Sequence, residues 1–512
     1  MSQLPTHPSG EYEIEKSTED LELIPVDTFG GKVHVKWDSQ ASLTPLGQLA
    51  FFIEFLKTSG LFNNWVESCP MSYTSNNAPI KRDVLGTILM SILAGHKRYA
   101  HITSVRCDDV NPGLLGMSKI VSEDSVRRAL KDNLAEAAAG QWLDKSFYQT
   151  YFPLLRESWI LDVDTTVKPL YGKQENAVVG YNPQKPGRPS HVYHSYMMAN
   201  IRLILNVEVH AGNKTASKFT APGLWNLLNN LSKDQWPEFI RGDCNFGNDA
   251  IMSEAERIGI PYLFKLKQTN NVKKLINYCM TTHEWENAGQ KWEGIESKLQ
   301  LHGWNHPRRV VILRKQIPKE VAVLKTTDQL ELDFAEVNEK MRVYEYAVLV
   351  TSLDDEIYTI AQHYRDRADS ENNFDELKNQ WGWCGFTTHD FKRSHLMAQI
   401  IALIYNWWTL FVRLINPSKH TEALTSRPLL LHAVGRQTRH ANQTKLVITS
   451  IHGKAKEIHQ RLAKLSRFFK KLQSSAEQLT DIEKWYLILS RAFVKYLKGR
   501  VLKPPNLIPV VL

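Results

Sequence analysis

Short apolar segments alternate with amphipathic ones in the middle of this 512-residue chain, and this alternation constrains the fold more than any other feature of the sequence. The segments with the length and composition of strands are 159–166, 193–209, 238–243 and 261–267, and helices are expected at 219–231 and 248–258. Strands that alternate with helices indicate an α/β sheet. The sequence therefore predicts an α/β fold with flanking helices.

The sequence on either side of this core divides the rest of the chain. Residues 285–343 interrupt the alternation with aromatic, glycine and β-branched residues, which favours a strand-rich insertion before a further strand at 344–352. Ser122 is a predicted N-cap of a helix in the N-terminal part. We expect the following division: a disordered N-terminus at 1–28, a helical DNA-binding domain at 29–155, a catalytic domain in two parts at 156–284 and 344–391 that flank the insertion at 285–343, and a basic helical domain for dimerisation or DNA binding at 392–512.

Four functional side chains recur at helical spacing near the end of the second catalytic part. Tyr364, Arg367, Glu371 and Lys378 fit the pattern Tyr-x2-Arg-x3-Glu-x6-Lys. At about 100° per residue these positions fall within an arc of roughly 60° on one helix. One helix face is thus predicted to present a carboxylate among cations, an arrangement that suits a metal ion acting on a phosphate.

Carboxylates also occur at predicted strand ends. Asp162 and Asp164 alternate on one face of the first strand, and Asp243 ends a later strand before a glycine-containing turn. Taken singly, each is more typical of a turn or helix cap, and Glu371 of a solvated helix residue. Together they indicate a site for hard divalent cations such as Mg²⁺ or Mn²⁺. Two such ions about 3.5–4 Å apart can activate a water and stabilise a leaving oxygen at a phosphodiester.

Charge and hydropathy indicate the partners and the compartment. The net charge is +9, and residues 391–512 hold 21 Lys and Arg against 5 Asp and Glu, which points to a polyanion such as DNA or RNA. The apolar run at 396–415 carries Gln399, Asn406 and Arg413, so we interpret it as a buried core helix and expect no membrane contact. The chain has no Cys-x2-Cys pair and no apolar signal region, which favours a cytoplasmic setting.

These motifs resemble those of DDE transposases of bacterial insertion sequences, in the cut-and-paste group with the Tyr-Arg-Glu-Lys signature. The resemblance covers about residues 29–415 and is carried by that signature and by three further motifs: Asp-x-Asp-Thr-Thr at 162–166, the Gly/Pro-rich box at 180–190 that contains Arg188, and Arg-x-Asp-x-x-Phe-Gly at 241–247. It implies an RNase H-like catalytic domain and two bound Mg²⁺ ions, with Mn²⁺ as a substitute.

The resemblance also implies roles for individual residues. Asp164, Asp243 and Glu371 would bind the metal ions. Asp164 is preferred to the alternative, Asp162, because the family often has Thr or Ser directly after its first aspartate. The residues expected to contact DNA are Tyr364, Arg367, Lys378 and Arg188. Trp304 is expected to stack on an unpaired base, with Trp292 as the alternative for that role. A buried position in the core is nevertheless the more common one for a tryptophan.

The implied reaction is cleavage of transposon ends and their joining to target DNA, through a hairpin intermediate in related enzymes. The resemblance implies terminal inverted repeats and target DNA as partners, a homodimer that holds two ends, and a bacterial, nucleoid-associated location. The alternatives are a transposase-derived DNA-binding protein without catalysis, and a glycoside hydrolase with paired carboxylates, which the cationic neighbours of Glu371 disfavour. The pair His191-x2-His194 has a spacing that could suit a zinc site, but two histidines at this spacing are more often ordinary strand or loop residues.

Overall fold

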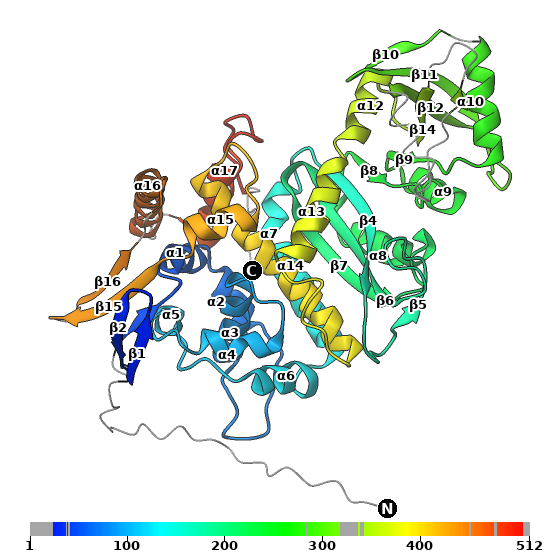
Figure 1. The fold of residues 1–512 in the computed structure, drawn as a ribbon. Coiled ribbons are helices and arrows are strands. Elements are labelled where there is room, and N and C mark those ends of the chain that lie inside the picture. Colours follow the sequence, from blue (N-terminus) through cyan, green and yellow to red (C-terminus); the bar gives the residue numbers. More distant parts are fainter. Residues whose placement is uncertain are drawn as a thin grey trace, which may run out of the picture.

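A computed structural model of the protein describes residues 24–36, 38, 41–282, 284–317, 336–337, 343–441, 443–449, 452–475 and 479–504. The central sheet lies between a helical mass built from both ends of the chain and a smaller β-rich lobe (Figure 1). The predicted α/β class is confirmed, and the sheet is mixed.

The central sheet contains the strands that the sequence predicts. Its five core strands lie in the order β7-β6-β4-β8-β9, in which β4 pairs antiparallel with β6 and parallel with β8. Their bounds are β4 Ile160–Pro169, β6 Pro189–Met198, β7 Leu203–Ala211, β8 Phe239–Gly242 and β9 Tyr262–Lys265, with a short β5, Val178–Val179, beside β6. Nearly every residue of β4, β6 and β8 is buried, as expected for strands covered on both faces.

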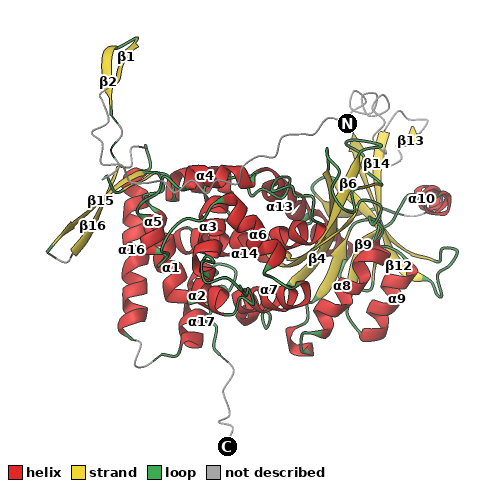
Figure 2. Ribbon diagram, turned by 90° about the horizontal axis from the view of Figure 1, so that it is seen from below, coloured by secondary structure: helices red, strands yellow, loops and turns green. Residues whose placement is uncertain are grey.

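Helices cover both faces of this sheet (Figure 2). On one side lie α8, Ser217–Asn229, and α9, Asp249–Ile258, and the Asn248 side chain caps α9 by accepting a hydrogen bond from Ile251 N at 3.3 Å. On the other side lie α7, Glu136–Tyr151, and α14, Phe391–Ile415. The described helix α14 is long and apolar enough to cross a membrane, but 94% of its apolar window is buried in the fold, as the core-helix interpretation expects.

The lobe continues the central sheet rather than standing apart from it. Strand β14, Val343–Thr351, pairs with β12 along most of its length and with β9 at its end. The other lobe elements are β10 Glu286–Gly289, β11 Trp292–Leu299, β12 Arg308–Ile317, β13 Glu336–Val337, α10 Asn270–Thr282 and α12 Ile357–Arg365. The strand-rich character predicted for 285–343 holds over its described residues, and 318–335 and 338–342 lie outside them.

The helical mass contains strands that the sequence reading missed. Its helices are α1 Leu49–Ser59, α2 Leu61–Glu67, α3 Lys81–Leu93, α4 Ile102–Val105, α5 Asn111–Leu114, α6 Glu123–Asp132, α15 Ala423–Leu430, α16 Ala455–Ser474 and α17 Asp481–Ala492. As predicted, the Ser122 side chain caps α6, accepting from Ser125 N at 3.2 Å. The wholly helical C-terminal domain is a wrong prediction, because β15, Val434–His440, and β16, Gln443–Thr449, form a hairpin that joins β3, Leu43–Thr44.

The expected disorder of residues 1–28 also needs correction where the structure describes them. Strand β1, Ile24–Thr28, pairs with β2, Gly31–Val35, across a tight turn at Gly31 with φ of 107°. This conformation is open to glycine and strained for other residues. Residues 1–23 lie outside the described residues.

Candidate active site

Asp162 is held in a buried ion pair. Its carboxylate accepts Arg241 Nε at 2.6 Å and Nη2 at 2.8 Å, and the two side chains are 3% and 2% exposed. The parallel register of β4 and β8 places Asp162 directly opposite Arg241, and Arg241 also donates to the His363 carbonyl. Asp162 is therefore engaged by a fixed guanidinium, which favours Asp164 over Asp162 as the ligand to a metal ion.

Asp164 lies two residues further along β4, against cations and a second carboxylate. Its Oδ2 accepts Arg367 Nη2 at 2.6 Å, and its Oδ1 accepts the Thr165 amide at 2.7 Å. The pKa of Asp164 is raised to about 7, mainly by burial. The charge of Arg367 opposes this rise, and the charge of the neighbouring Asp243 adds to it. A pKa raised this far means that the neighbouring groups do not fully stabilise the ionised carboxylate. A divalent cation would supply the missing positive charge.

Asp243 follows β8 directly and meets Asp164 at the same edge of the sheet. Val163 pairs with Gly242, so the next residue on each parallel strand is one of these two aspartates. Asp243 is half-buried, and its carboxylate accepts the Asn245 amide at 2.9 Å. Asp243 faces a cavity of about 740 Å³ lined also by Tyr181 of the Gly/Pro-rich box and by the lysines Lys265, Lys267 and Lys273.

The Tyr-Arg-Glu-Lys motif does not lie on one continuous helix. Tyr364 is in the last turn of α12, and Arg367 caps α13, Ala368–Asn379. The Arg367 amide bonds the Tyr364 carbonyl three residues back at 3.1 Å, whereas the Asp366 amide still bonds four residues back, so the helix tightens into a 3₁₀-type turn at the junction. The predicted single helix face is thus wrong in detail.

Three members of the motif nevertheless gather around the two aspartates. Burial raises the pKa of Tyr364, Arg367 opposes the shift, and the Asp243 and Asp164 charges add to it. Burial also lowers the pKa of Lys378, and the nearby Cys384 and Asp164 partly offset this shift by raising it. A phenol, a guanidinium and an ammonium therefore border the acidic pair.

Glu371 is placed by its backbone only. It lies on α13, four residues after Arg367, which is about 6 Å further along the helix axis. The helix that carries Glu371 is therefore anchored to Asp164 through Arg367. The side chain of Glu371 lies outside what the structure describes.

The other two predicted DNA contacts, Trp304 and Arg188, and the alternative Trp292 are not among the residues that line the cavity at Asp243. Trp304 is only 8% exposed, and Arg308 lies over its ring at 5.2 Å, so in this conformation the ring is not presented to a base. Trp292 is half-buried and lines a cavity of about 660 Å³ in the lobe. Arg188 is exposed on the loop before β6 and stacks over Tyr171 at 4.8 Å.

Sequence reasoning missed Arg241, which fixes Asp162. The signal was present, because Arg241 precedes Asp243 by two residues on a strand and so shares its side of the sheet. Only the register between β4 and β8 shows that the guanidinium meets Asp162.

A second group of potential metal ligands lies on β6 and β7. His194, Glu208 and His210 present atoms within 4.8 Å of one another. Both ring nitrogens of His194 already have partners, the Lys214 carbonyl at 2.8 Å and Thr220 Oγ1 at 3.0 Å. His191 bonds the Glu175 carbonyl at 2.8 Å, so this geometry favours structural roles for both histidines of the weak zinc reading.

Two carboxylates on adjacent parallel strands of a mixed α/β sheet, one in the middle of β4 and one directly after β8, are bordered by cations and define the class of site. The comparison with known families agrees with it. The family model described as Transposase DDE domain group 1 matches residues 63–470, and the chain belongs to this family of DDE transposases. Membership implies a transposase that uses divalent metal ions. No curated protein matches the sequence.

One solved structure that resembles the chain is described as a piggyBac transposase synaptic complex with hairpin DNA. The two share 11% sequence identity with a TM-score of 0.41, over 92% of this chain and 89% of that chain.

Proposed function

We propose that the protein is an active DNA transposase that cleaves transposon ends and joins them to target DNA by phosphodiester hydrolysis and transesterification. The observation that carries this proposal is the convergence of Asp164, in the middle of β4, and Asp243, directly after the neighbouring β8, beside the helix that bears Glu371. Family membership supports the reaction class.

The strand order supports an RNase H-like catalytic domain. Three antiparallel strands, β7, β6 and β4, are followed across the sheet by the parallel strands β8 and β9. In this arrangement the first and fourth strands of the domain are neighbours, so that Asp164 on β4 lies next to Asp243, where β8 ends. Open α/β sheets bind ligands at the carboxyl ends of their strands, which is where β8 ends.

The donor set fits hard divalent cations. Asp164, Asp243 and Glu371 would hold two Mg²⁺ ions, or Mn²⁺ in their place, and the ions would supply activation of the attacking oxygen and stabilisation of the leaving one. The raised pKa of Asp164 supports this fit, since burial and the nearby Asp243 leave its charge undercompensated in the metal-free chain. Asp162 would hold no ion, because Arg241 neutralises it.

The cations around the carboxylates would bind and orient the DNA. Lys378 and the Tyr364 hydroxyl border the acidic pair, and Lys265, Lys267 and Lys273 line the adjoining cavity, so a phosphate that enters there meets positive charge on two sides. Arg367 bonds Asp164 and would keep that carboxylate oriented during phosphoryl transfer.

The remaining features of the proposal extend the resemblance seen in the sequence. The ends would be terminal inverted repeats of a bacterial insertion sequence, a hairpin would form between first-strand cleavage and joining, and a homodimer would hold the two ends. The protein would act in the bacterial cytoplasm at the nucleoid.

The proposal is tested with duplexes that carry the DNA flanking the gene. Glu371→Gln is expected to bind these ends as the wild type does and to lose Mg²⁺-dependent nicking by at least about a hundredfold, because a metal ligand becomes a neutral amide. Asp375→Asn is the matched control, since Asp375 is an exposed acid on the same helix. Nicking by Glu371→Gln at the wild-type rate would overturn the assignment.

Two other results would select the alternatives. Tight end binding by the wild type without any Mg²⁺-dependent nicking would indicate a transposase-derived DNA-binding protein. Hydrolysis of glycosides that survives EDTA would indicate the paired-carboxylate hydrolase instead.

A further inference from the structure

The β15–β16 hairpin projects from the helical mass at the end of the molecule away from the catalytic strands (Figures 1 and 2). We call it the arm, residues 434–449. It is attached through β3, which pairs with Gly435 and Arg436 at the base of β15. Most of its side chains are exposed, so the arm has little core of its own. A two-stranded ribbon of this kind is only marginally stable alone, which favours a partner in the working state.

The outer face of the arm is cationic. The strand register places Arg436 opposite Val447 and Thr438 opposite Lys445 on one face, with His440 near its tip, and all of these side chains are exposed. The sequence from 423 to 456 contains no aspartate or glutamate. Within the described part of the chain, Arg436 and Lys445 form no ion pair, so no protein group compensates their charge.

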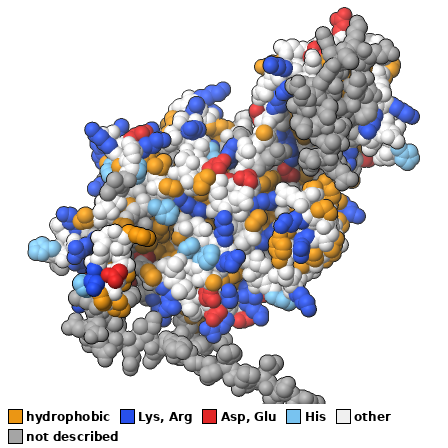
Figure 3. All heavy atoms as spheres, viewed as in Figure 1, with side chains coloured by type: hydrophobic (Ala, Val, Ile, Leu, Met, Phe, Trp, Pro, Cys, Tyr) orange, Lys and Arg blue, Asp and Glu red, His pale blue; other side chains and the backbone are white. Residues whose placement is uncertain are grey.

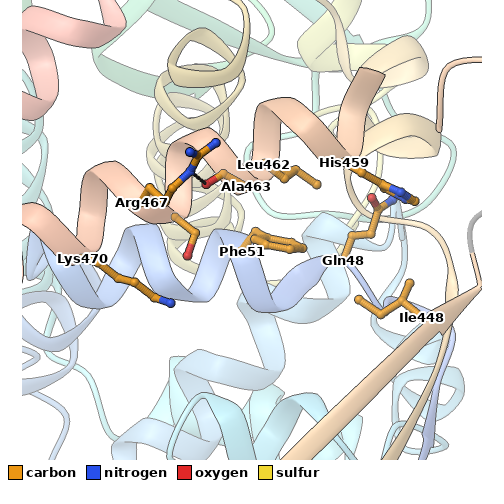
Figure 4. Close-up of a pocket in the computed structure, with 9 residues that line it drawn as sticks. Gln48, Phe51, Ile448, His459, Leu462, Ala463, Arg467 and Lys470 are labelled. Atoms are coloured by element: carbon orange, nitrogen blue, oxygen red, sulfur yellow. Dashed lines mark hydrogen bonds between the residues drawn. The ribbon is translucent and has the colours of Figure 1, made fainter. Parts of the chain in front are cut away.

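A groove at the base of the arm lies on the opposite face of the ribbon, because Ile448, which lines it, alternates with Val447. It has a volume of about 440 Å³ and lies between α1, β16 and α16 (Figure 4). Phe51, Leu462 and Ile448 form apolar walls, and His459, Arg467 and Lys470 stand on α16 at helical spacing along the same side. Basic side chains are spread widely over the face shown in Figure 3, so charge alone does not single out the arm, whereas its projecting shape does.

We propose that the cationic face of the arm binds the backbone of duplex DNA at a distance from the Asp164–Asp243 pair. The inference rests on the proposed function, because it concerns how that enzyme holds its substrate. A second copy of the chain is the less favourable occupant, since its own arm and basic C-terminal part would bring like charge to the same place. Phosphates meet Arg436 and Lys445 without that repulsion, and a β-ribbon is narrow enough to follow a DNA groove.

The test measures affinity for fluorescent mixed-sequence duplexes of increasing length as a function of salt. Arg436→Gln with Lys445→Gln is expected to reduce the slope of log K against log salt by about 1.8, because each lost phosphate contact contributes about 0.9. The loss should appear only with duplexes long enough to reach from the catalytic cavity to the arm. Nicking within a bound end, measured at saturating protein, should stay at the wild-type rate.

Two controls make the result specific. Lys498→Gln with Lys503→Gln removes the same charge from exposed positions of the C-terminal part outside the arm, and it should leave the slope unchanged. Arg436→Lys with Lys445→Arg keeps the charge and should bind as the wild type does, which separates loss of contacts from loss of the hairpin.

Each other outcome is decisive. If the arm variant binds long duplexes with the wild-type slope, the arm does not contact DNA. If the variant keeps that slope but has a different oligomeric state from the wild type, the arm is a dimer contact. If the wild type binds long duplexes through the arm but never nicks them, the arm inference stands and the proposed catalysis fails.

Discussion

The charged residues around Asp164 and those on the arm differ in whether the chain itself supplies a partner of opposite charge. In the buried region each charge has a partner within the chain, such as Arg241 for Asp162 and Arg367 for Asp164. On the arm, Arg436 and Lys445 are exposed and form no ion pair among the described residues. The difference teaches that buried charge must be compensated when the chain folds, whereas exposed charge can await a ligand.

Asp164 stands between these two regimes. It has a cationic partner, yet burial and Asp243 keep its pKa far above the usual range for an aspartate. Arg367 alone is therefore insufficient compensation. This incomplete compensation is the reason why we propose Asp164, rather than Asp162, as a ligand of the metal ion.

The largest expected effect comes from breaking the buried pair. Arg241→Met leaves the carboxylate of Asp162 buried without its guanidinium, which costs about 3–5 kcal/mol of unfolding free energy. Denaturant unfolding followed by tryptophan fluorescence measures the loss. Combining Asp162→Asn with Arg241→Met removes both charges and should recover most of it; a double variant as unstable as the single one would show that packing, not charge, is responsible.

A smaller effect concerns Asp164 and pH in the metal-free protein. Because the folded chain holds its proton up to about pH 7 while the unfolded chain releases it near about pH 4, the stability that this proton contributes is fully present below pH 4 and is lost as the pH rises to 7. Relative to Asp164→Asn, the wild type should lose at most about 1.4 kcal/mol for each pH unit in that window and nothing further above it.

Thermal unfolding in EDTA across that pH range measures the difference between the two proteins. Mg²⁺ added at pH 7 should raise the melting temperature of the wild type and not that of Asp164→Asn, since binding to the folded state stabilises it. A constant difference at every pH would show that folding does not raise the pKa of Asp164.

The smallest effect sharpens the contrast between buried and exposed cations. Lys378→Ala should weaken end binding and reduce the salt slope by about 0.9, the contribution of one phosphate contact, which is half of the effect expected for the arm pair. Because burial lowers the pKa of Lys378, its contact should also weaken more steeply than that of Arg436 as the solution becomes alkaline. An unchanged slope would remove Lys378 from the DNA-binding set.

The sequence predicted the features that are set by local patterns. Strand β4 and the position of Asp162 and Asp164 on one of its faces follow from apolar alternation, and the cap at Ser122 follows from residue type. The predicted strand end was wrong, because β4 runs on to Pro169 and keeps Asp164 in its middle. The ion pair between Asp162 and Arg241 was not predictable, because it depends on the register of two strands separated by 79 residues in sequence.

Other errors have the same tertiary origin. The helix break between Tyr364 and Arg367 has no proline or glycine to signal it, and it coincides with the bond from Arg367 to Asp164 on a distant strand. Trp304 appeared available for stacking because sequence shows no burial, whereas Arg308 packs over it and also pairs with Asp249 at 2.7 Å. The arm was missed because its basic and polar residues resemble a solvated helix more than a strand.

The path of the chain out of the β-rich lobe has a mechanical consequence. Strand β14 belongs to the lobe and to the central sheet at once, α12 packs back against β10 and β11, and one tight turn joins α12 to the helix of Glu371. In the proposed transposase, a load applied to the lobe would be transmitted through α12 to the helix that carries Glu371. Tilting the lobe and aligning that helix would then be a single movement, so substrate bound far out on the lobe would set the timing of the cut.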